Sequence, residues 1–587
     1  MNDLFLERLS TMLALVPLQT TPWLPVWVTP LWILGIGVLA GFVVAAVLLA
    51  VLAVLSRVPG LGTLGDRPRV ANAVAGVLTL IVAAVTLSLY WSQTTADYRI
   101  LLILPVLAMS AIVGWGLVYG MWRRTVHELW SVLTEGVMGY ALGAAAVVMV
   151  IGLAITPWAE DTRPILESLK QVNWVGDGER VQPIVVPAVS SDVTDPDDAP
   201  FRQFFVEYDP AAITELSIES NRTIILADAE SPEDFQIRPT RIDPDAPFTW
   251  KRGELGGVPL PTDPAEGLWI QNREIDPATV NFRIVSLPPI QQVSSIVIAA
   301  LAVVLSILAY IAFRQAAPRV AAIALATSKS EMAQPLYFVL LALGAVAMIL
   351  FMIVPFNTLG EDIKLLKDSG MTLIMVLGLI QAVWSAGTSV ADEIEGKTAL
   401  TVLSKPVSRR SFLLGKYAGI MMAVFVLFVV LGLLLMVVTA YKPIFDAREN
   451  SQEVPMWQES HGEMVSVVPG IALYFMETMA IGAIGVAIAT RLPMLANFVI
   501  CFIVYVVGNL TAPLVRSSDG SNELVGFVGK LIAVVVPNLN AFNIQSAVDA
   551  GNPIPPIYLA GAFNYLVCFG IMTLMVALLL FEDRDLA

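Results

Sequence analysis

The sequence predicts a polytopic α-helical membrane protein with about eleven transmembrane helices and one β-rich domain outside the membrane. The composition is 57% hydrophobic and only 14% charged, and the apolar residues fall in long runs. A helix needs about 20 consecutive apolar residues to cross the hydrocarbon core of a bilayer, and most of these runs are of that length. One long segment differs from the rest, because it is polar and rich in proline and aspartate. That segment predicts a folded domain outside the membrane.

The apolar runs predict spans in two groups, five and then six. We expect an N-terminal four-span region at 1–157, the β-rich domain at 158–292, a fifth span at 293–313 and a six-span core at 314–587. A shorter apolar stretch, 524–536, ends at a proline and is typical of a re-entrant or interfacial segment. The predicted spans are 30–55, 70–91, 100–122, 132–157, 293–313, 335–355, 371–391, 412–440, 466–490, 494–509 and 557–581.

Basic residues in the short loops predict the orientation, because cytoplasmic loops carry an excess of lysine and arginine. When the spans alternate, every basic cluster falls on the same side. The sequence therefore predicts a multi-pass protein of a bacterial inner (cytoplasmic) membrane, with the C-terminus in the cytoplasm and residues 158–292 and the N-terminus outside. The clusters contain Arg57, Arg67, Arg69, Arg123, Arg124, Arg314, Arg319, Lys329, Lys397, Lys405, Arg409, Arg410 and Lys416.

The polar segment at 158–292 holds 24 acidic and 11 basic residues, which accounts for most of the net charge of −15. An acidic surface repels phosphates, so nucleic acid is not expected as a partner. Alternating apolar and polar residues predict strands at 204–208, 215–219, 223–226 and 281–285, with Asp-Pro turns between such stretches. We expect a small, sandwich-like β domain.

The residue pattern does not point to a metal site or an enzyme active site. Cys501 and Cys568 lie inside apolar runs, and the two histidines, His127 and His461, are far apart. Zinc sites need several such ligands at close spacing. The motifs of zinc proteases and serine hydrolases are absent from the sequence. We therefore expect no metal, no cofactor and no catalytic activity on this chain.

The most informative segment is 389–419, SVADEIEGKTALTVLSKPVSRRSFLLGKYAG. A long apolar helix ends near Ala391, and an acidic turn follows it. Next comes a short amphipathic helix with Leu400 and Leu403 at helical spacing, which Pro406 ends. We expect this helix to lie across the cytoplasmic face and to connect two neighbouring spans. A soluble partner that pushes on it would then move both spans together.

This segment resembles the coupling region of the type-2 ATP-binding-cassette (ABC) exporter permeases. In that family a glutamate-rich turn, a Gly-Thr pair, paired leucines, a Ser-x-Pro, a Ser-Arg and a Gly-Lys follow the second core span. Lys397 separates the glycine from the threonine here, which departs from the family pattern. The resemblance covers 319–587, includes an amphipathic helix at 320–332, and leaves out the first 313 residues. The matching residues are Glu393, Glu395, Gly396, Thr398, Leu400, Leu403, Ser404, Pro406, Ser408, Arg409, Gly415 and Lys416.

The resemblance implies a permease subunit in which two copies or paralogues form a translocation path and two ATP-binding subunits dock below. A coupling helix at 392–410 would sit in a groove of the ATPase, and Mg-ATP would bind to that separate subunit. The alternative is an ordinary charged loop near lipid headgroups. The acidic turn runs against the positive-inside tendency, which favours a basic protein partner over anionic lipid at this segment.

A second motif in the same segment does not fit ATP binding. Residues from Ala391 to Thr398 match a relaxed phosphate-loop pattern, but a true phosphate loop follows a β-strand. This segment follows a membrane helix, and Asp392, Glu393 and Glu395 would repel the phosphates. ATP hydrolysis is therefore expected on another chain.

Four polar residues inside the predicted spans are candidates for lining a translocation path: Gln381, Glu477, Asn497 and Asn509. A charged group at mid-span costs about 2.5–3.5 kcal/mol on insertion scales, so Glu477 is by default a functional candidate. The competing interpretation is that these side chains only hydrogen-bond between helices.

Two classes of function fit the sequence. The first is the permease of an ATP-driven exporter, surrounded by membrane lipids. The second is an ABC-coupled membrane scaffold or signalling subunit, whose outer domain binds a partner while no substrate crosses. ATP-dependent flux in reconstituted vesicles would distinguish these two classes.

Overall fold

The structure is a computed structural model of the whole chain, and it divides into two compact units. The first unit contains Met1–Glu160 and Ser295–Ala587, and the second contains Asp161–Ser294. The described residues are 23–91, 98–134, 136–160, 162–170, 172, 179–189, 199–206, 208, 212–231, 235, 239–244, 246–252, 260–261, 267–286, 288–353, 361–396, 408–518, 536–543 and 554–582.

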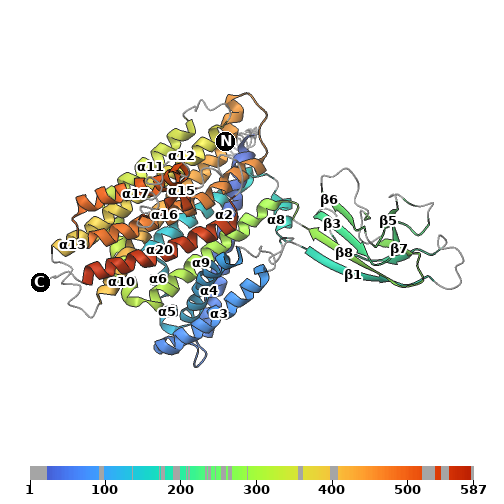
Figure 1. Cartoon of the computed structure of the whole chain (residues 1–587), viewed down its shortest axis with the longest axis horizontal. Helices are drawn as coiled ribbons and strands as arrows, with labels where there is room; N and C mark the ends of the chain where they lie inside the picture. The colour runs from blue at the N-terminus through green and yellow to red at the C-terminus, as the bar shows by residue number, and fades with distance from the viewer. Residues whose placement is uncertain are drawn as a thin grey trace, which may run out of the picture. The chain divides into compact units, whose positions relative to one another are not determined.

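The first unit is helical (Figure 1). Apolar runs become long helices, and short polar or proline-containing stretches end them. The π-helical turn η8 joins α12 directly to α13. The helices are α2 (Trp23–Leu55), η1 (Leu64–Asp66), α3 (Pro68–Trp91), α4 (Arg99–Gly120), α5 (Arg123–His127), α6 (Leu129–Thr134), α7 (Val137–Ala154), η3 (Thr156–Trp158), α9 (Ser294–Ala316), α10 (Pro318–Met332), α11 (Pro335–Ile353), α12 (Asp362–Ala386), η8 (Gly387–Ala391), α13 (Asp392–Glu395), α15 (Arg409–Glu449), α16 (Trp457–Ala489), α17 (Met494–Ser518), η9 (Leu539–Phe542) and α20 (Pro556–Glu582).

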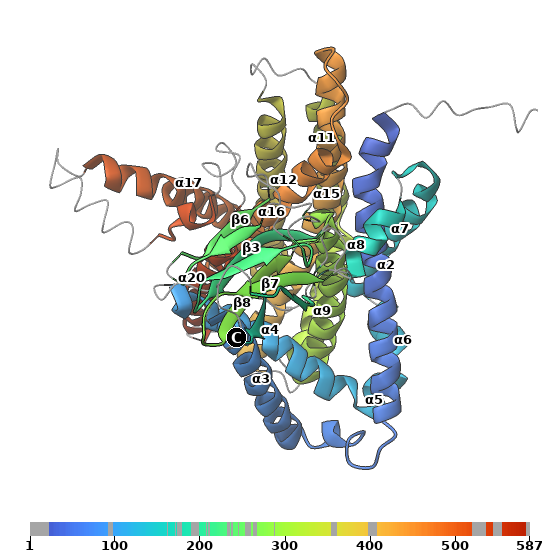
Figure 2. The ribbon, with the colours of Figure 1, turned by 90° about the vertical axis from the view of Figure 1, so that its right-hand side faces the viewer.

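Within the described residues, ten helices are long and apolar enough to cross a membrane. The predicted series of long apolar helices is confirmed, with ten such helices against about eleven predicted spans, and this is compatible with a multi-pass membrane protein. The difference lies at 494–509, where the apolar part of α17, Met494–Leu510, is shorter than the other spans. Figure 2 shows that α17 also runs at a steep angle to α11 and α12.

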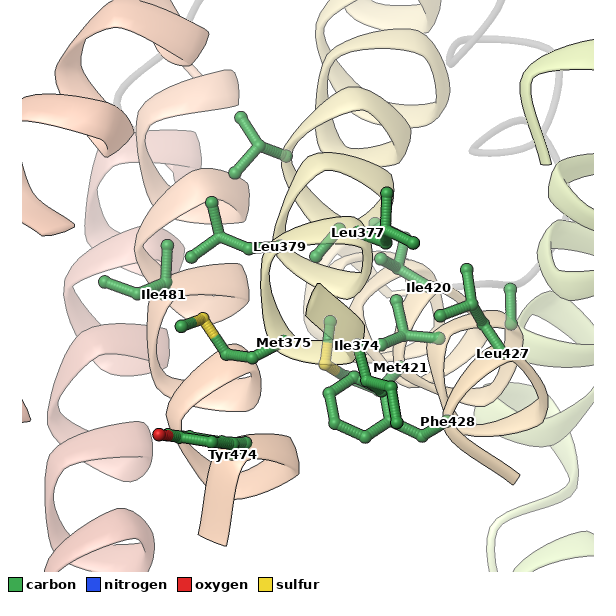
Figure 3. Packing of buried hydrophobic residues seen from close by; sticks show 14 of the residues in the cluster. Ile374, Met375, Leu377, Leu379, Ile420, Met421, Leu427, Phe428, Tyr474 and Ile481 are labelled. Carbon is green, nitrogen blue, oxygen red and sulfur yellow. The ribbon is translucent and has the colours of Figure 1, made fainter. Parts of the chain in front are cut away.

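The core of the helical unit is formed by α12, α15 and α16. In α12 and its continuation, 72% of the most apolar window is buried, against 22% in α11. Figure 3 shows the packing, in which Met375, Met421 and Ile481 come from these three helices. The outer helices α3, α4 and α11 expose many large apolar side chains, which is the surface that a hydrocarbon environment favours.

The second unit contains two four-stranded antiparallel sheets, in the orders β1-β8-β3-β6 and β2-β7-β4-β5. The β-rich character of this domain is therefore confirmed. Buried residues of both sheets, among them Leu216, Ile224 and Phe282, belong to one apolar cluster. The elements are α8 (Thr162–Lys170), β1 (Glu179–Val186), β2 (Arg202–Phe204), β3 (Ile213–Ser220), β4 (Ile224–Ala227), β5 (Thr240–Ile242), β6 (Phe248–Lys251), β7 (Leu268–Asn272), β8 (Ala278–Ser286) and η7 (Gln291–Val293).

The strand predictions agree with the structure in three of four places. The stretches 215–219, 223–226 and 281–285 fall in β3, β4 and β8. The fourth, 204–208, overlaps only the last residue of β2, because that strand ends at Phe204. An Asp-Pro turn at Asp276 leads from β7 into β8, as the turn chemistry indicates.

Candidate functional site

The described part of the predicted coupling segment consists of its two ends. The first end is α13 with Gly396, and the second begins at Ser408, the N-cap of α15. The Ser408 hydroxyl accepts a hydrogen bond from the Ser411 backbone N–H at 3.1 Å, which fixes where α15 starts. Five predicted site residues lie outside the described residues, and so does the side chain of Glu395. These five are Thr398, Leu400, Leu403, Ser404 and Pro406.

A π-helical turn connects the central helix α12 to the acidic turn. This turn, η8, spans Gly387–Ala391 and leads directly into α13. Isolated π-helical turns are rare and occur frequently at functional sites, because they change the direction of side chains within a continuous helix. Gly387 also permits a close approach of α17, since a Cβ atom there would lie 2.5 Å from Cγ of Met494.

A buried carboxyl group, Glu331 at the end of α10, is the centre of a polar network beside this turn. Glu331 is 1% exposed. Its Oε2 atom accepts hydrogen bonds from the Ser385 hydroxyl at 2.6 Å and from Gln334 Nε2 at 3.0 Å. Gln381 Nε2 donates to the Ser385 hydroxyl at 2.8 Å, and Trp384 Nε1 donates to Gln334 Oε1 at 3.1 Å. The network therefore ties α10 to the last turns of α12.

Burial raises the pKa of Glu331 above its ordinary value of 4.5, because a carboxylate loses its hydration there. The hydrogen bond from Ser385 and the charge of Lys416 act in the opposite direction, and the charge of Glu393 raises the pKa further. Glu331 is thus a carboxyl group whose proton affinity depends on the charges at the start of the acidic turn.

An ion pair connects the acidic turn to α15. Nζ of Lys416 lies 2.5 Å from Oε1 of Glu393, and the lysine side chain is only 8% exposed. The ammonium group also lies 5.6 Å from the ring centroid of Phe412, one turn earlier on α15. The structure therefore brings together two predicted site residues, Glu393 and Lys416, which are 23 residues apart in the sequence.

Small residues on α15 allow α10 to pack closely enough for these contacts. A Cβ atom on Gly415 would lie 2.7 Å from Cβ of Ile323, and one on Gly419 would lie 2.5 Å from the backbone oxygen of Ala324. Lys416 lies between these two glycines. The close contact of the helix backbones thus brings Lys416 to the same region as the Glu331 network.

A cavity of about 640 Å³ opens among α10, η8, α13 and α15. Its wall contains both charged centres, Glu331 and the Glu393–Lys416 ion pair, together with the hydroxyl groups of Thr327, Ser330 and Thr388. No group of three or more His, Cys, Asp or Glu side chains in the described part of the chain is arranged to hold a metal ion. What the arrangement provides is a polar connection between three helices and the acidic turn.

Arg409, another predicted site residue, binds the end of a different helix. Its Nη1 donates to the backbone oxygens of Phe581 at 3.1 Å and Glu582 at 2.7 Å, which are among the last carbonyls of α20. The guanidinium also lies 5.7 Å from the ring centroid of Phe581, which stacks on Phe412. Because α20 has no basic residue in its own last turn, Arg409 supplies the cation that stabilises its C-terminus.

Replacement of Arg409 by methionine should therefore lower the free energy of unfolding by about 1–2 kcal/mol, because two charge-assisted hydrogen bonds and a cation at a helix C-terminus are lost. A denaturant titration of the purified chain in detergent measures this change. Arg410→Met is the matched control, since Arg410 is the exposed next residue of α15. Equal stability of the two variants would contradict the assignment.

The four candidates for a translocation path lie along the packing of α12, α16 and α17. Gln381, Glu477 and Asn497 are buried, and Asn509 hydrogen-bonds the carboxyl group of Glu477. Gly485 of α16 lies near Asn497, so Asn497 lies at one end of the α16–α17 contact, and Glu477 and Asn509 lie together elsewhere along it. Gln381 belongs instead to the Glu331 network. The four residues thus do not form one cluster.

Unsatisfied polar atoms distinguish three of these residues. Gln381 Oε1, Glu477 Oε1 and Asn497 Nδ2 are buried and lack a hydrogen-bond partner among the described residues. A buried polar atom without a partner costs about 1–3 kcal/mol, so a water molecule or another polar group in contact with these atoms would be stabilising.

Sequence reasoning missed Glu331, Ser385 and Gln334. The helix at 320–332 was predicted, but its acidic residue carries no signal, because a glutamate beside lysine on an amphipathic helix usually faces solvent. Only the close packing of α10 on α15 buries it. Neither a protein-family model nor a curated protein matches this chain. Its function must therefore be inferred from residues and geometry.

Proposed function

We propose that this chain is the membrane-spanning permease subunit of an ATP-driven ABC exporter of the type-2 class. It would work with a second permease copy or a paralogue, and with a separate ATP-binding subunit that holds Mg-ATP. The chain would lie in a bacterial inner membrane, with its C-terminus in the cytoplasm and a sandwich-like domain at 158–292 outside. The motif at 389–419 and the polar connection at its two ends support this proposal.

The observation that carries the proposal is the double attachment of the acidic turn. Through η8 the turn continues α12, and through Glu393 and Lys416 it is held to α15. Glu331 adds α10 through Ser385 of α12. A force applied by an ATPase to the segment between Gly396 and Ser408 would therefore move three packed helices together. Buried polar groups couple motions well, because breaking one partner from the other is costly.

The proposal is tested by purifying the chain together with the ATP-binding subunit encoded beside it. Asp392→Lys combined with Glu395→Lys reverses the charge of the turn while it leaves the Glu393–Lys416 ion pair intact, and Asp392 is exposed. We expect this variant to lose the ATPase from the complex. Glu459→Lys, an exposed reversal in the first turn of α16, is the matched control and should keep it.

Two results would overturn the proposal. One is a chain that captures no ATP-binding subunit in any lipid, and the other is a complex that survives reversal of the acidic turn as well as it survives the control. A complex that is lost only in the turn variant, while the chain remains folded by its melting temperature, would support docking at this turn.

A further inference from the structure

A second polar cavity, of about 690 Å³, lies among the first spans, α9 and α10, away from the site described above. Its wall is formed by the loop before α3, the end of α4 with α5, the end of α9 and one face of α10. Among the described residues, three cations line it, Arg124, Arg314 and Lys329, and one carboxylate, Glu128. The cavity is therefore a cationic site at the ends of membrane helices.

In the described part of the chain, the cations of this cavity outnumber its carboxylates. Glu128 pairs with Arg124 at 2.9 Å, which leaves Arg314 and Lys329 in excess. Nη1 of Arg314 is buried and has no hydrogen-bond partner among the described residues. A buried guanidinium nitrogen without an acceptor is costly, and an anion with several acceptor oxygens would supply one. Phosphate oxygens fit a guanidinium best, because its donors form a planar fork.

Backbone and aromatic groups complete the wall. The N-terminus of α10 has no side-chain cap, and its first residues, Pro318 and Ala321, line the cavity. Free N–H groups at such an end favour a negative charge. Tyr119 and Trp122, where α4 ends, also line the cavity. Tyrosine and tryptophan are the residues that proteins place at the headgroup level of a membrane.

We propose that this cavity binds the phosphate-bearing headgroup of an anionic membrane phospholipid, held by Arg314, Lys329 and Arg124. A soluble phosphate compound has the same anionic group, but the position of the cavity favours lipid. The cavity lies where two apolar helices, α4 and α9, end, which is the level at which lipid headgroups lie beside membrane helices. Basic pockets between membrane helices on the cytoplasmic side are known to hold anionic headgroups.

Helix α10 contributes to the walls of both cavities. One face of α10, with Leu325 and Lys329, lines the lipid cavity, and another, with Thr327 and Glu331, lines the cavity next to the acidic turn. A bound headgroup would restrain α10 against α9 and the first spans. The first five spans would thereby influence the Glu331 network through a single helix.

The test is an equilibrium titration of the full chain in non-ionic detergent with short-chain phosphatidylglycerol, short-chain phosphatidylcholine, glycerol phosphate and inorganic phosphate. We expect saturable binding of phosphatidylglycerol that is at least about tenfold tighter than that of the other three. Arg314→Gln and Lys329→Gln should each weaken it about fivefold, the effect of removing one cation near an anionic lipid. Arg57→Gln, an exposed cation outside the cavity, should leave it unchanged.

Equal binding of phosphatidylglycerol and phosphatidylcholine would overturn the proposal, as would variants that bind like the original chain. Binding of inorganic phosphate or glycerol phosphate as tight as that of phosphatidylglycerol would assign the cavity to a soluble anion instead of a lipid. Lys329 is exposed, so Lys329→Gln should not disturb the fold. If Arg314→Gln lowers the melting temperature, Lys329→Gln still tests the proposal. The titration needs no ATPase, and its outcome is independent of the proposed exporter function.

Discussion

Replacement of Glu331 by leucine is expected to lower the free energy of unfolding by about 4 kcal/mol, because it leaves several buried donors without an acceptor. The Ser385 hydroxyl and the Gln334 amide both donate to Glu331 Oε2, and the Thr388 hydroxyl lies 3.5 Å from Oε1. Each unsatisfied donor costs about 1–3 kcal/mol, and leucine recovers only part of this loss by packing. A denaturant titration in detergent, with melting temperature as a second measure, detects a change of this size.

Two further variants separate the loss of hydrogen bonds from other causes. Glu331→Gln keeps an acceptor oxygen and should lose less than half as much stability. Glu459→Leu, at an exposed position, should change stability little. A leucine variant as stable as the original chain would show that the network does not hold α10 to α12.

The raised pKa of Glu331 predicts that the free energy of unfolding depends on pH. Because the folded chain raises the pKa of Glu331 above 4.5, the folded state binds a proton more tightly than the unfolded state. The stability from this group is complete below pH 4.5 and decreases as the pH rises through the higher folded pKa. Glu331→Gln should remove that part of the pH dependence.

The helices of this fold could be predicted from sequence because membrane spans depend on composition over long windows. The runs at 412–440 and 557–581 fall inside α15 and α20, since an apolar segment of that length has no other way to satisfy its backbone in lipid. The predicted first and last residues of the spans were less accurate. The span predicted at 412–440 is part of a helix that continues to Glu449, because the polar residues beyond Ala440 remain helical.

The contacts of the candidate site could not be predicted in the same way. Arg409 and Lys416 were both identified as cations beside a span, but the sequence does not say that one binds α20 and the other Glu393. These partners lie 23 residues away in one case and 172 or more in the other, so the tertiary packing determines which side chains meet. The π-helical turn at Gly387–Ala391 was not predicted from the sequence either.

Replacement of Lys416 by methionine is expected to lower the free energy of unfolding by about 3 kcal/mol, because it leaves the carboxyl groups of Glu393 and Glu331 near each other without a cation. The lysine is 8% exposed, so water cannot easily replace it. The measurement is the same denaturant titration, and Arg410→Met on the exposed side of α15 is the control. If Lys416→Met were no more destabilising than this control, the ion pair would have no part in holding the acidic turn.

The double variant Lys416→Met with Glu393→Leu distinguishes a structural role of the pair from a role in docking. Removal of both charges at a nearly buried pair commonly restores stability, because no unpaired charge remains. We therefore expect the double variant to regain most of the stability lost in Lys416→Met. Its ATPase-binding strength then shows what the Glu393 carboxylate does. If binding returns together with stability, Glu393 serves only to hold α13 to α15, and the docking charges are Asp392 and Glu395. If stability returns while binding does not, the partner ATPase contacts Glu393 itself, and Lys416 holds that carboxylate in place for the contact.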